Sequence, residues 1–172
     1  MKELKWWGLP LVWVGVIFGF SSQSADEQEM EPFLSQYLPL ETLRPFLEKI
    51  EFTYYHSTRS VEVMGLEPFV EFLIRKLAHF GVYFILALLI YVAVLKILDS
   101  KRFIQIAMTY FLLIHFAISD ELSQSFSPGR TPYYGDVAID AFGGLVGIFV
   151  ALFFLYFKKK DYRSSGVHSR AF

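Results

Sequence analysis

Polar and ionisable side chains interrupt the ends of long apolar stretches in this sequence. An ionised side chain at the middle of a bilayer costs about 2.5–3.5 kcal/mol on insertion scales, so several at one level must pair, bind a ligand or line a polar cavity. Guanidinium and ammonium groups hold phosphate oxygens, an imidazole acts as a general base or nucleophile, and carboxylates orient that imidazole or bind Mg²⁺ or Ca²⁺. The side chains concerned are Arg75, Lys76, His79, Asp120, Glu121, Gln124, Arg130, Asp136 and Asp140.

Spacing places several of these side chains on shared helix faces. Arg75, His79 and Tyr83 follow one another at i, i+4 and i+8, and Asp120 and Gln124 are stacked at i, i+4, so each set lies along one side of a helix. His79 sits about one turn inside an apolar run, where an imidazole is normally avoided, which favours a functional role. Snorkelling to lipid headgroups is the alternative explanation for the cations that precede it.

Two neighbouring acids, Asp120 and Glu121, close the third apolar stretch. Negative charge at a helix C-terminus opposes the helix dipole, so local helix stability does not explain them. Adjacent helical positions point about 100° apart, so at least one of the two side chains is expected to face the interior of a bundle. Ion pairing with the cations at positions 75, 76 and 130 is the structural alternative to a catalytic role.

Asp136 and Asp140 lie one helical turn apart at the start of the fourth apolar stretch. Helix capping explains Asp136, because a carboxylate is favoured at an N-terminus, but Asp140 lies one turn further in. Gly143 and Gly147 follow in a G-x-x-x-G pattern, which is typical of helices that approach closely. The aspartate-bearing start of this helix is therefore expected to be held tightly against a neighbouring helix.

Four apolar stretches supply the elements that must position these residues. They cover about residues 6–22, 76–98, 103–124 and 135–157, and the last three have about the 20 residues that a helix needs to cross hydrocarbon. A backbone in lipid must satisfy its own hydrogen bonds, which favours helices over isolated strands. The sequence therefore predicts an all-α integral membrane protein, a bundle of four transmembrane helices that forms a single domain over residues 1–160.

The first apolar stretch, preceded by Lys2 and Lys5, has two interpretations. It is either a signal peptide or a retained membrane anchor. The match to a small-x-small cleavage site at Ser22-Gln23-Ser24 is weak, so an anchor is expected.

The distribution of Lys and Arg predicts the orientation of the spans. Basic residues lie close to the spans at both termini and between the second and third spans, and are sparser elsewhere. By the positive-inside rule, both termini are cytoplasmic and the polar cluster faces outward. The dense set is Lys2, Lys5, Lys96, Lys101, Arg102, Lys158, Lys159, Lys160, Arg163 and Arg170, and the sparse set is Arg44, Lys49, Arg59, Arg75, Lys76 and Arg130.

Residues 23–74 form the one sizeable segment outside the predicted spans. The segment is acidic and its apolar residues recur at helical spacing, so two or three short amphipathic helices are expected, lying against the membrane or capping the bundle. A tethering loop and a substrate lid are alternatives for its role. Residues 161–172 are expected to form a disordered cytoplasmic tail.

Composition excludes several other classes of protein. The formal net charge is −1 and no basic patch with interleaved aromatic residues is present, which argues against a nucleic-acid partner. The sequence has no cysteine, so it can form neither a disulfide nor a thiolate metal site and has no cysteine nucleophile.

The order of these motifs resembles the VanZ-like family. The pattern consists of Ser21-Ser22-Gln23, Arg75-Lys76-x-x-His79-Phe80-x-x-Tyr83, Asp120-Glu121-x-x-Gln124, Pro128-Gly129-Arg130, Asp136-Val137 and Gly143. Asp140 departs from it, since the family often carries asparagine there. The resemblance implies a bacterial cell-membrane protein. The family's namesake is linked to low-level resistance to the glycopeptide antibiotic teicoplanin, and families proposed to be related include enzymes that act on lipid headgroups.

Two functions from different classes fit these observations. The first is an enzyme that transfers, exchanges or hydrolyses a phosphodiester on the headgroup of a phospholipid or a lipid-linked cell-wall precursor. The second is a non-catalytic binder or modulator of an anionic lipid or a glycopeptide antibiotic. A transporter is disfavoured because the polar residues occupy one leaflet and line no path. A purely structural anchor leaves the acids at the end of the third span unexplained.

The enzyme hypothesis assigns a role to each residue of the cluster. Cations would hold phosphate oxygens, the imidazole would take a proton, and carboxylates would orient it or hold a divalent cation. The predicted catalytic residues are His79, Asp120 and Glu121; the predicted substrate-binding residues are Arg75, Lys76, Tyr83, Gln124 and Arg130; the predicted ligands of Mg²⁺ or Ca²⁺ are Asp136, Asp140 and Glu121.

Overall fold

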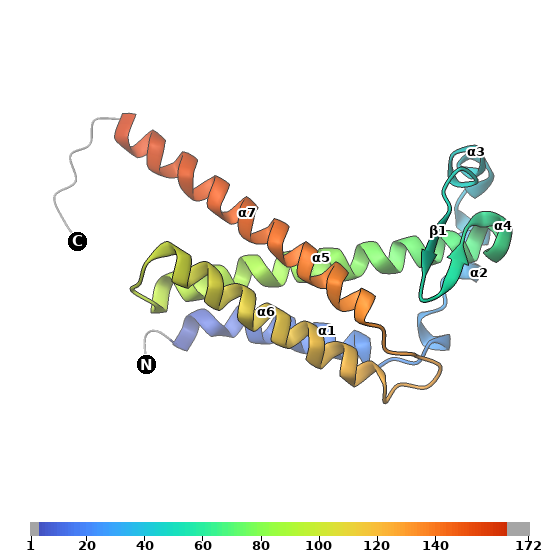
Figure 1. Cartoon of the computed structure of the whole chain (residues 1–172), viewed down its shortest axis with the longest axis horizontal. Coiled ribbons are helices and arrows are strands. Elements are labelled where there is room, and N and C mark those ends of the chain that lie inside the picture. Colours follow the sequence, from blue (N-terminus) through green and yellow to red (C-terminus); the bar gives the residue numbers. More distant parts are fainter. Residues whose placement is uncertain (1–3, 165–172) are drawn as a thin grey trace.

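The computed structural model describes residues 4–164, whose long helices form a bundle with a small cap at one end (Figure 1). A 3₁₀ turn, η1 (Leu4–Trp7), leads into α1. The bundle helices are α1 (Gly8–Ser21), α5 (Leu66–Ile97), α6 (Arg102–Gln124) and α7 (Tyr134–Ser164). α5 contacts α1, α6 and α7, and its contact with α7 is the most extensive between any two elements. Every other helix of the bundle is therefore positioned against α5.

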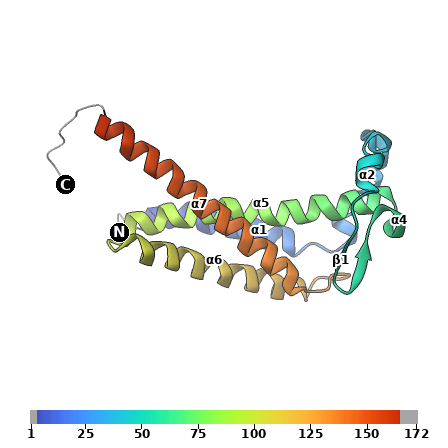
Figure 2. The ribbon, with the colours of Figure 1, turned by 45° about the horizontal axis from the view of Figure 1, so that its top comes forward.

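The cap is built from the segment between α1 and α5. Its elements are η2 (Asp26–Gln28), α2 (Glu31–Tyr37), η3 (Leu40–Thr42), α3 (Arg44–Leu47), β1 (Phe52–Tyr54), β2 (Ser57–Arg59) and α4 (Val61–Met64). A small apolar core of its own, which includes Leu34 and Phe69, lies apart from the core of the bundle. In the turned view (Figure 2), the cap lies at the end of the bundle opposite the start of α1 and the far end of α7.

A β-hairpin in the cap corrects the expectation of helices alone for residues 23–74. The short helices α2, α3 and α4 are present, but β1 and β2 pair antiparallel between them, with Tyr54 opposite Ser57. The turn residues Tyr55 and His56 both have positive φ, 51° and 58°, the left-handed conformation that fits the twist of a two-residue hairpin. Because the turn contains neither glycine nor asparagine, it carries none of the usual sequence signal of a hairpin.

Within the described residues, three helices are long and apolar enough to cross a membrane: α5, α6 and α7 as far as Lys158. The prediction of four transmembrane helices is confirmed for these three only. α1 has 14 residues and rises about 21 Å, less than the roughly 30 Å of a hydrocarbon core. The segment Lys5–Ser21 is long enough for a span only when it is counted together with Asp26–Tyr37, and these two segments are bent by 113° relative to each other.

Two helices extend beyond the predicted apolar spans. α5 begins at Leu66, well before position 76, directly after Gly65, whose φ of 93° turns the chain sharply between α4 and α5. The added turns carry Phe69 into the core of the cap, so α5 joins cap and bundle in one continuous helix. α7 continues to Ser164, into the segment 161–172 predicted to be a disordered tail; the rest of that segment lies outside the described residues.

The predicted close approach of the G-x-x-x-G helix is confirmed. A Cβ atom added to Gly143 would lie under 3.0 Å from the Phe80 carbonyl oxygen, and one on Gly147 equally close to the Phe84 carbonyl oxygen. α7 therefore packs directly on the backbone of α5, and this contact fixes the start of α7 beside the polar end of α5.

Replacing Gly143 by alanine is expected to destabilise the bundle by about 1–3 kcal/mol, because the added methyl group meets rigid backbone that cannot rotate away. The measurement is the thermal unfolding temperature in detergent micelles. Gly15→Ala in α1 is the matched control, since nothing lies within 4 Å of its added Cβ. Equal melting temperatures for the two variants would contradict the packing argument.

Candidate functional site

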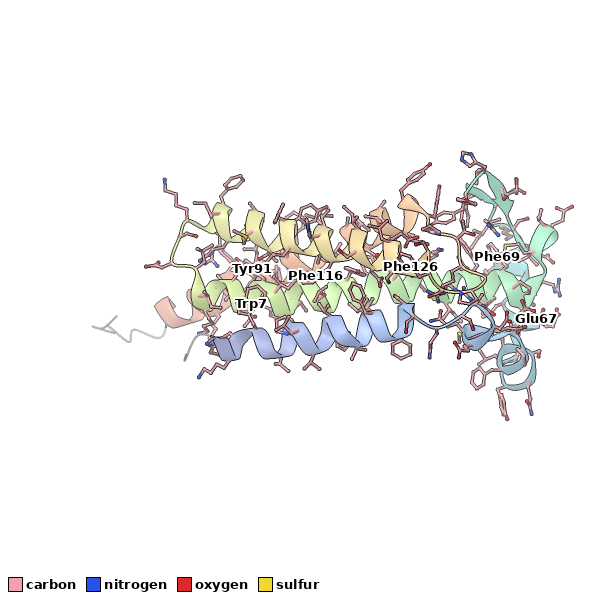
Figure 3. All side chains as sticks on the ribbon, turned by 90° about the horizontal axis from the view of Figure 1, so that it is seen from below. Trp7, Glu67, Phe69, Tyr91, Phe116 and Phe126 are labelled. Atoms are coloured by element: carbon pink, nitrogen blue, oxygen red, sulfur yellow. The ribbon has the colours of Figure 1, made fainter. Side chains whose placement is uncertain are left out.

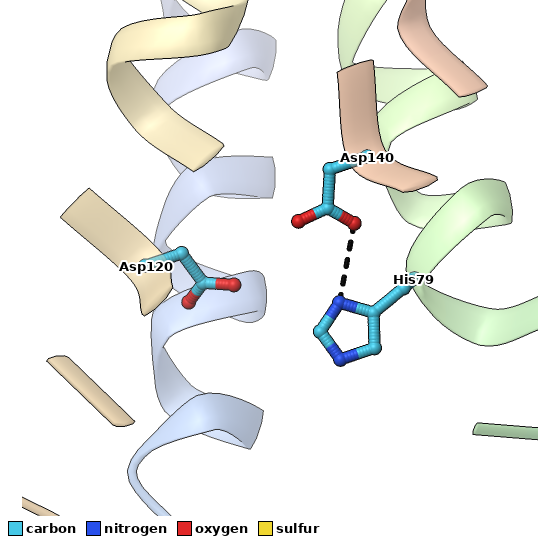
Figure 4. A group of neighbouring side chains, drawn as sticks. All are labelled: His79, Asp120 and Asp140. Atoms are coloured by element: carbon cyan, nitrogen blue, oxygen red, sulfur yellow. Dashed lines mark hydrogen bonds and ion pairs between the residues drawn. The ribbon is translucent and has the colours of Figure 1, made fainter. Parts of the chain in front are cut away.

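A hydrogen bond between α5 and α7 forms the centre of the polar cluster. His79 Nδ1 lies 3.1 Å from Asp140 Oδ1 (Figure 4). The Asp140 side chain is 1% exposed and that of His79 is 14% exposed. An ionised carboxylate only accepts hydrogen bonds, so Nδ1 carries the proton in this pair and Nε2 is left free to accept one. The close contact of α5 and α7 thus gives the imidazole an orienting partner, which accounts for an aspartate that capping does not explain.

Asp120 of α6 faces the same space from the opposite side. Figure 4 shows its carboxylate directed toward the His79–Asp140 pair, with α1 behind. One ligand atom from each of the three side chains lies within 4.8 Å of the others. Asp120 Oδ1 and Asp140 Oδ2 are buried and have no hydrogen-bond partner among the described residues. Because unpaired buried carboxylate oxygens are costly, this arrangement favours occupation by a proton, a cation or a polar ligand.

The predicted set of metal ligands, Asp136, Asp140 and Glu121, does not assemble as one group. The group dense enough to hold a metal ion, within the part of the chain that the structure describes, is His79, Asp120 and Asp140. Two of the three predicted ligands lie outside it, because each already has other partners. Lys76 and a tyrosine contact Asp136 Oδ1, and the backbone N–H of Tyr133 donates to Glu121 Oε1.

Lys76 and Asp136 form a second polar pair between α5 and α7, on the cap side of the first. Lys76 Nζ lies 2.5 Å from Asp136 Oδ1, and the phenol of Tyr54 in β1 donates to the same oxygen over 2.5 Å. The Lys76 ammonium also lies 4.8 Å from the centre of the Tyr54 ring. Tyr54 was not among the predicted site residues, because β1 was not predicted. The aromatic residues Phe52 and Tyr54 at alternate positions were the signal that could have found the strand.

Arg75 is held by an acid from the same helix. Arg75 Nη2 lies 2.5 Å from Glu71 Oε1, and the other oxygen of Glu71 accepts the backbone N–H of Met30 at 2.9 Å. Glu71 was also missed, although its i, i+4 spacing to Arg75 is a recognisable signal once α5 is known to begin at Leu66. Ion pairs of Asp120 or Glu121 with Arg75, Lys76 or Arg130, the structural alternative to a catalytic role, are not among the ion pairs of the described residues.

Arg130 lies in the connection between α6 and α7 and reaches back to the cap. Its guanidinium donates to Gln28 Oε1, while its buried Nε has no partner among the described residues. Burial lowers the pKa of Arg130 from its ordinary value, yet a guanidinium stays protonated in proteins. The connection itself is tied to the end of α1, since Ala25 N–H donates to the Pro128 carbonyl and Ser127 Oγ donates to the Ser21 carbonyl.

Tyr83 and Gln124 are buried at the edge of the cluster. Tyr83 is 0% exposed and belongs to the apolar core of the bundle, and its hydroxyl has no partner among the described residues. Gln124 is buried at the end of α6, and its Nε2 is likewise without a partner there. Both side chains therefore have a hydrogen-bonding group without a partner among the described residues. Neither side chain lines either of the two cavities of the structure that are described below.

A cavity of about 580 Å³ opens beside the His79 imidazole. Its walls come from α1, the segment that follows it, α5, the end of α6 and the connection into α7, and they are apolar at Trp13, Ile17 and Val82. Nitrogen and oxygen atoms are frequent at the cap end of the bundle, near Phe69 and Phe126 in Figure 3. The polar residues that line the cavity are Arg75, His79, Asp120, Arg130, Ser21, Gln23, Glu27, Gln28 and Glu29. The space thus combines an apolar wall with a polar end that carries an imidazole, three carboxylates and two guanidinium groups.

The Tyr54–Asp136 hydrogen bond gives a pH-dependent prediction. Burial, and then the hydrogen bond to Asp136, raise the pKa of the Tyr54 phenol above its ordinary value. The folded protein keeps this proton to higher pH than the unfolded chain, so the stabilisation is complete below about pH 10 and is lost as pH rises further. The Tyr54→Phe variant is expected to show a shallower fall in melting temperature above about pH 10 than the wild type. Equal slopes would contradict the assignment, and Tyr37→Phe, at an exposed position, is the control.

A family model described as VanZ/LLP1 matches residues 6–155, which include every residue of the site described above. No curated protein and no solved structure matches the chain.

Proposed function

The chain belongs to the VanZ/LLP1 family, and we propose that it is an enzyme that acts on the phosphate headgroup of a membrane lipid. The substrate class is a phospholipid or a lipid-linked cell-wall precursor, and the reaction is transfer or hydrolysis of its phosphodiester. The observation that carries the proposal is the His79–Asp140 pair, whose imidazole opens into a cavity with an apolar wall and a polar end that includes two guanidinium groups.

His79 is the general base of this mechanism. Asp140 holds the proton on Nδ1, so Nε2 takes the proton of an attacking hydroxyl, either water or an acceptor alcohol. The oxygen attacks phosphorus, the bond from phosphorus to the leaving oxygen breaks, and the imidazolium returns the proton to that oxygen. Asp140 is a positioning residue here, because it is sealed from the cavity. Asp120, on the opposite wall, stabilises the imidazolium that forms.

The shape and charge of the cavity support a lipid substrate. Acyl or isoprenoid chains fit the wall formed by α1 and α5, where Ile17 and Val82 are exposed to the cavity. The phosphate then meets Arg75 and Arg130 at the polar end, and guanidinium groups bind phosphate oxygens in a bidentate way. Their present partners, Glu71 and Gln28, hold both side chains in position before the substrate arrives, which favours charge stabilisation in the transition state.

A divalent cation fits the same three side chains. His79, Asp120 and Asp140 supply one nitrogen and up to four carboxylate oxygens, two of which are unpaired. Mg²⁺ and Ca²⁺ prefer the oxygens, whereas the imidazole suits Mn²⁺ or Zn²⁺. A bound cation would polarise the phosphoryl group. Because metal binding to the imidazole nitrogen would prevent its use as a base, the test of the reaction includes metal removal.

The proposed location is the bacterial cell membrane, with both termini cytoplasmic and the site at the outer leaflet. The dense positive charges beside the termini and between α5 and α6 support this orientation. The even number of crossings that this arrangement requires is reached if α1, with the 3₁₀ turn η1 before it, crosses together with α5, α6 and α7. Action on a lipid-linked cell-wall precursor at this leaflet would connect the activity to the teicoplanin resistance associated with the family's namesake.

The test uses purified protein in nanodiscs that contain phospholipid or a lipid-linked cell-wall precursor. Headgroup loss or exchange is followed by mass spectrometry, with and without EDTA and added Mg²⁺, Ca²⁺ or Mn²⁺. Turnover of one lipid class is the expected result. If EDTA abolishes turnover, the added metal that restores the highest rate identifies the cation. If no lipid is converted but one is retained through purification and lost in Arg130→Ala, the protein is the non-catalytic lipid binder and not an enzyme.

A further inference from the structure

A second cavity, of about 390 Å³, lies under the cap and apart from the His79 imidazole. The β-hairpin, the start of α2, the first half of α5 and the connection into α7 form its walls. Its volume lies within the range of sites for small molecules. Arg75 lines both this outer cavity and the larger cavity beside His79, so the two spaces adjoin at one side chain.

The charges that line the outer cavity are matched except for one cation and one acid. Arg75 pairs with Glu71 and Lys76 pairs with Asp136, each at 2.5 Å. Arg59 of β2 and Glu31 of α2 form no ion pair within the described residues, neither with each other nor with another side chain. Opposite charges that line one cavity without meeting are complementary to a ligand that carries both signs.

Arg59 is held in position without an acid. Its guanidinium lies 5.4 Å from the centre of the Phe72 ring, and one of its nitrogens lies 3.9 Å from Met64 Sδ. Arg59 Nε is buried and has no hydrogen-bond partner in the described part of the chain. A buried donor of this kind is costly unless a ligand fills it, and a guanidinium is suited to a phosphate or carboxylate.

Three tyrosines form the wall beside these charges. Tyr54 and Tyr55 each pack edge-on against Tyr133, with ring centres 4.8 Å apart. Tyr55 reaches this position from a turn in which it has a φ of 51°, a conformation that costs a non-glycine residue roughly 1–2 kcal/mol. Strained backbone of this type is found at ligand sites, and aromatic faces attract ammonium groups.

We infer that the outer cavity binds a small zwitterion, a molecule with a phosphate or carboxylate group and an ammonium group. Arg59 binds the anionic group, and Glu31 with the tyrosine wall binds the ammonium. The site goes beyond the proposed reaction and needs neither His79 nor turnover. Where both cavities are filled, their occupants meet at Arg75, so the zwitterion lies beside the phosphate of the lipid.

The probe is phosphoethanolamine, which carries both charges, with inorganic phosphate and ethanolamine as single-charge comparisons. Binding to the full chain is measured by saturation-transfer NMR and by titration calorimetry in phosphatidylglycerol nanodiscs, whose headgroup carries no ammonium group. We expect phosphoethanolamine to bind more tightly than either comparison. Arg59→Gln and Glu31→Gln should each weaken its binding at least tenfold, whereas Arg59→Lys should retain part of it.

Arg44→Gln is the matched control, because Arg44 is an exposed cap arginine paired with Glu41 and Glu48 outside both cavities. It should bind the probe as the wild type does. His79→Ala, the variant that tests the proposed reaction, should also retain binding, so failure of the reaction and failure of this site are separate results.

A lipid headgroup is the second source of the same chemistry. Nanodiscs with phosphatidylethanolamine should compete with the soluble probe if the site takes a headgroup, and should not compete if it takes a free molecule. Enrichment of phosphatidylethanolamine that depends on Arg59, without binding of the soluble probe, supports the site and assigns it to lipid. Three results would overturn the inference. They are the absence of both forms of binding, binding that is unchanged in Arg59→Gln, and binding that is lost in His79→Ala.

Discussion

Replacing His79 with alanine is expected to reduce headgroup turnover by about 100- to 10,000-fold, the usual contribution of a positioned general base. The reason is geometric, because the His79 imidazole is the titratable ring that joins the buried Asp140 carboxylate to the large cavity. The measurement is the initial rate of headgroup release in nanodiscs, followed by mass spectrometry. Added imidazole should restore part of the rate to His79→Ala, since the vacated space opens into a cavity of about 580 Å³.

Two matched variants separate catalysis from folding in this experiment. His79→Asn retains a side-chain N–H for Asp140, so it should stay folded and inactive. Asp140→Asn keeps the shape of the orienting group without its charge, and is expected to lose less activity than His79→Ala and to gain nothing from added imidazole. Wild-type rates in His79→Asn would remove the imidazole from the mechanism.

The Lys76→Met variant is expected to lower the free energy of unfolding by about 3 kcal/mol or more, because it leaves the Asp136 carboxylate with no cation in a poorly solvated position. The side chains of this pair are only 17% and 10% exposed, so water replaces the lost ammonium poorly. Unfolding is measured by thermal denaturation in detergent micelles at neutral pH.

A double variant gives the control for the Lys76 prediction. Lys76→Met combined with Asp136→Asn removes both charges, and should be more stable than Lys76→Met alone although it carries one more substitution. If instead the two losses simply add, the ion pair contributes little and Lys76 is a free cation, as the substrate-binding role predicted from the sequence requires.

The spans α6 and α7 and the apolar part of α5 were predictable because hydrophobicity in lipid is a property of residue type alone. The start of α5 was not, since the turns before Arg75 are amphipathic and lie in the cap, where no membrane imposes an apolar run. α1 shows the opposite problem. Its residues are apolar enough for a span, but the helix ends at Ser21, and only the fold reveals that length.

For the candidate site, the sequence indicated which residues lie near one another better than it indicated which of them form pairs. The alternating direction of the spans places His79 and Asp120 at the same end of the bundle, as observed, because that placement depends only on which helix ends carry them. The choice of Asp140 over Asp136 as the partner of His79 depends on how far α7 slides along α5, which Gly143 and Gly147 set through backbone contact. Tyr54 and Glu31 enter the two polar centres from the cap, and how its hairpin and its short helices fold against α5 and α7 depends on tertiary contacts that local sequence does not specify.

The continuous helix α5 sets the depth at which chemistry can occur. From His79 to Ile97 the helix rises about 27 Å, at 1.5 Å per residue, close to the roughly 30 Å thickness of a hydrocarbon layer. With the C-terminal end of α5 at one boundary of that layer, the imidazole lies at the other, level with the glycerol and phosphate groups. In the proposed reaction, a lipid would therefore reach His79 by lateral diffusion within its own leaflet, without being lifted out of the membrane, and the substrate would come from the leaflet that the cap covers.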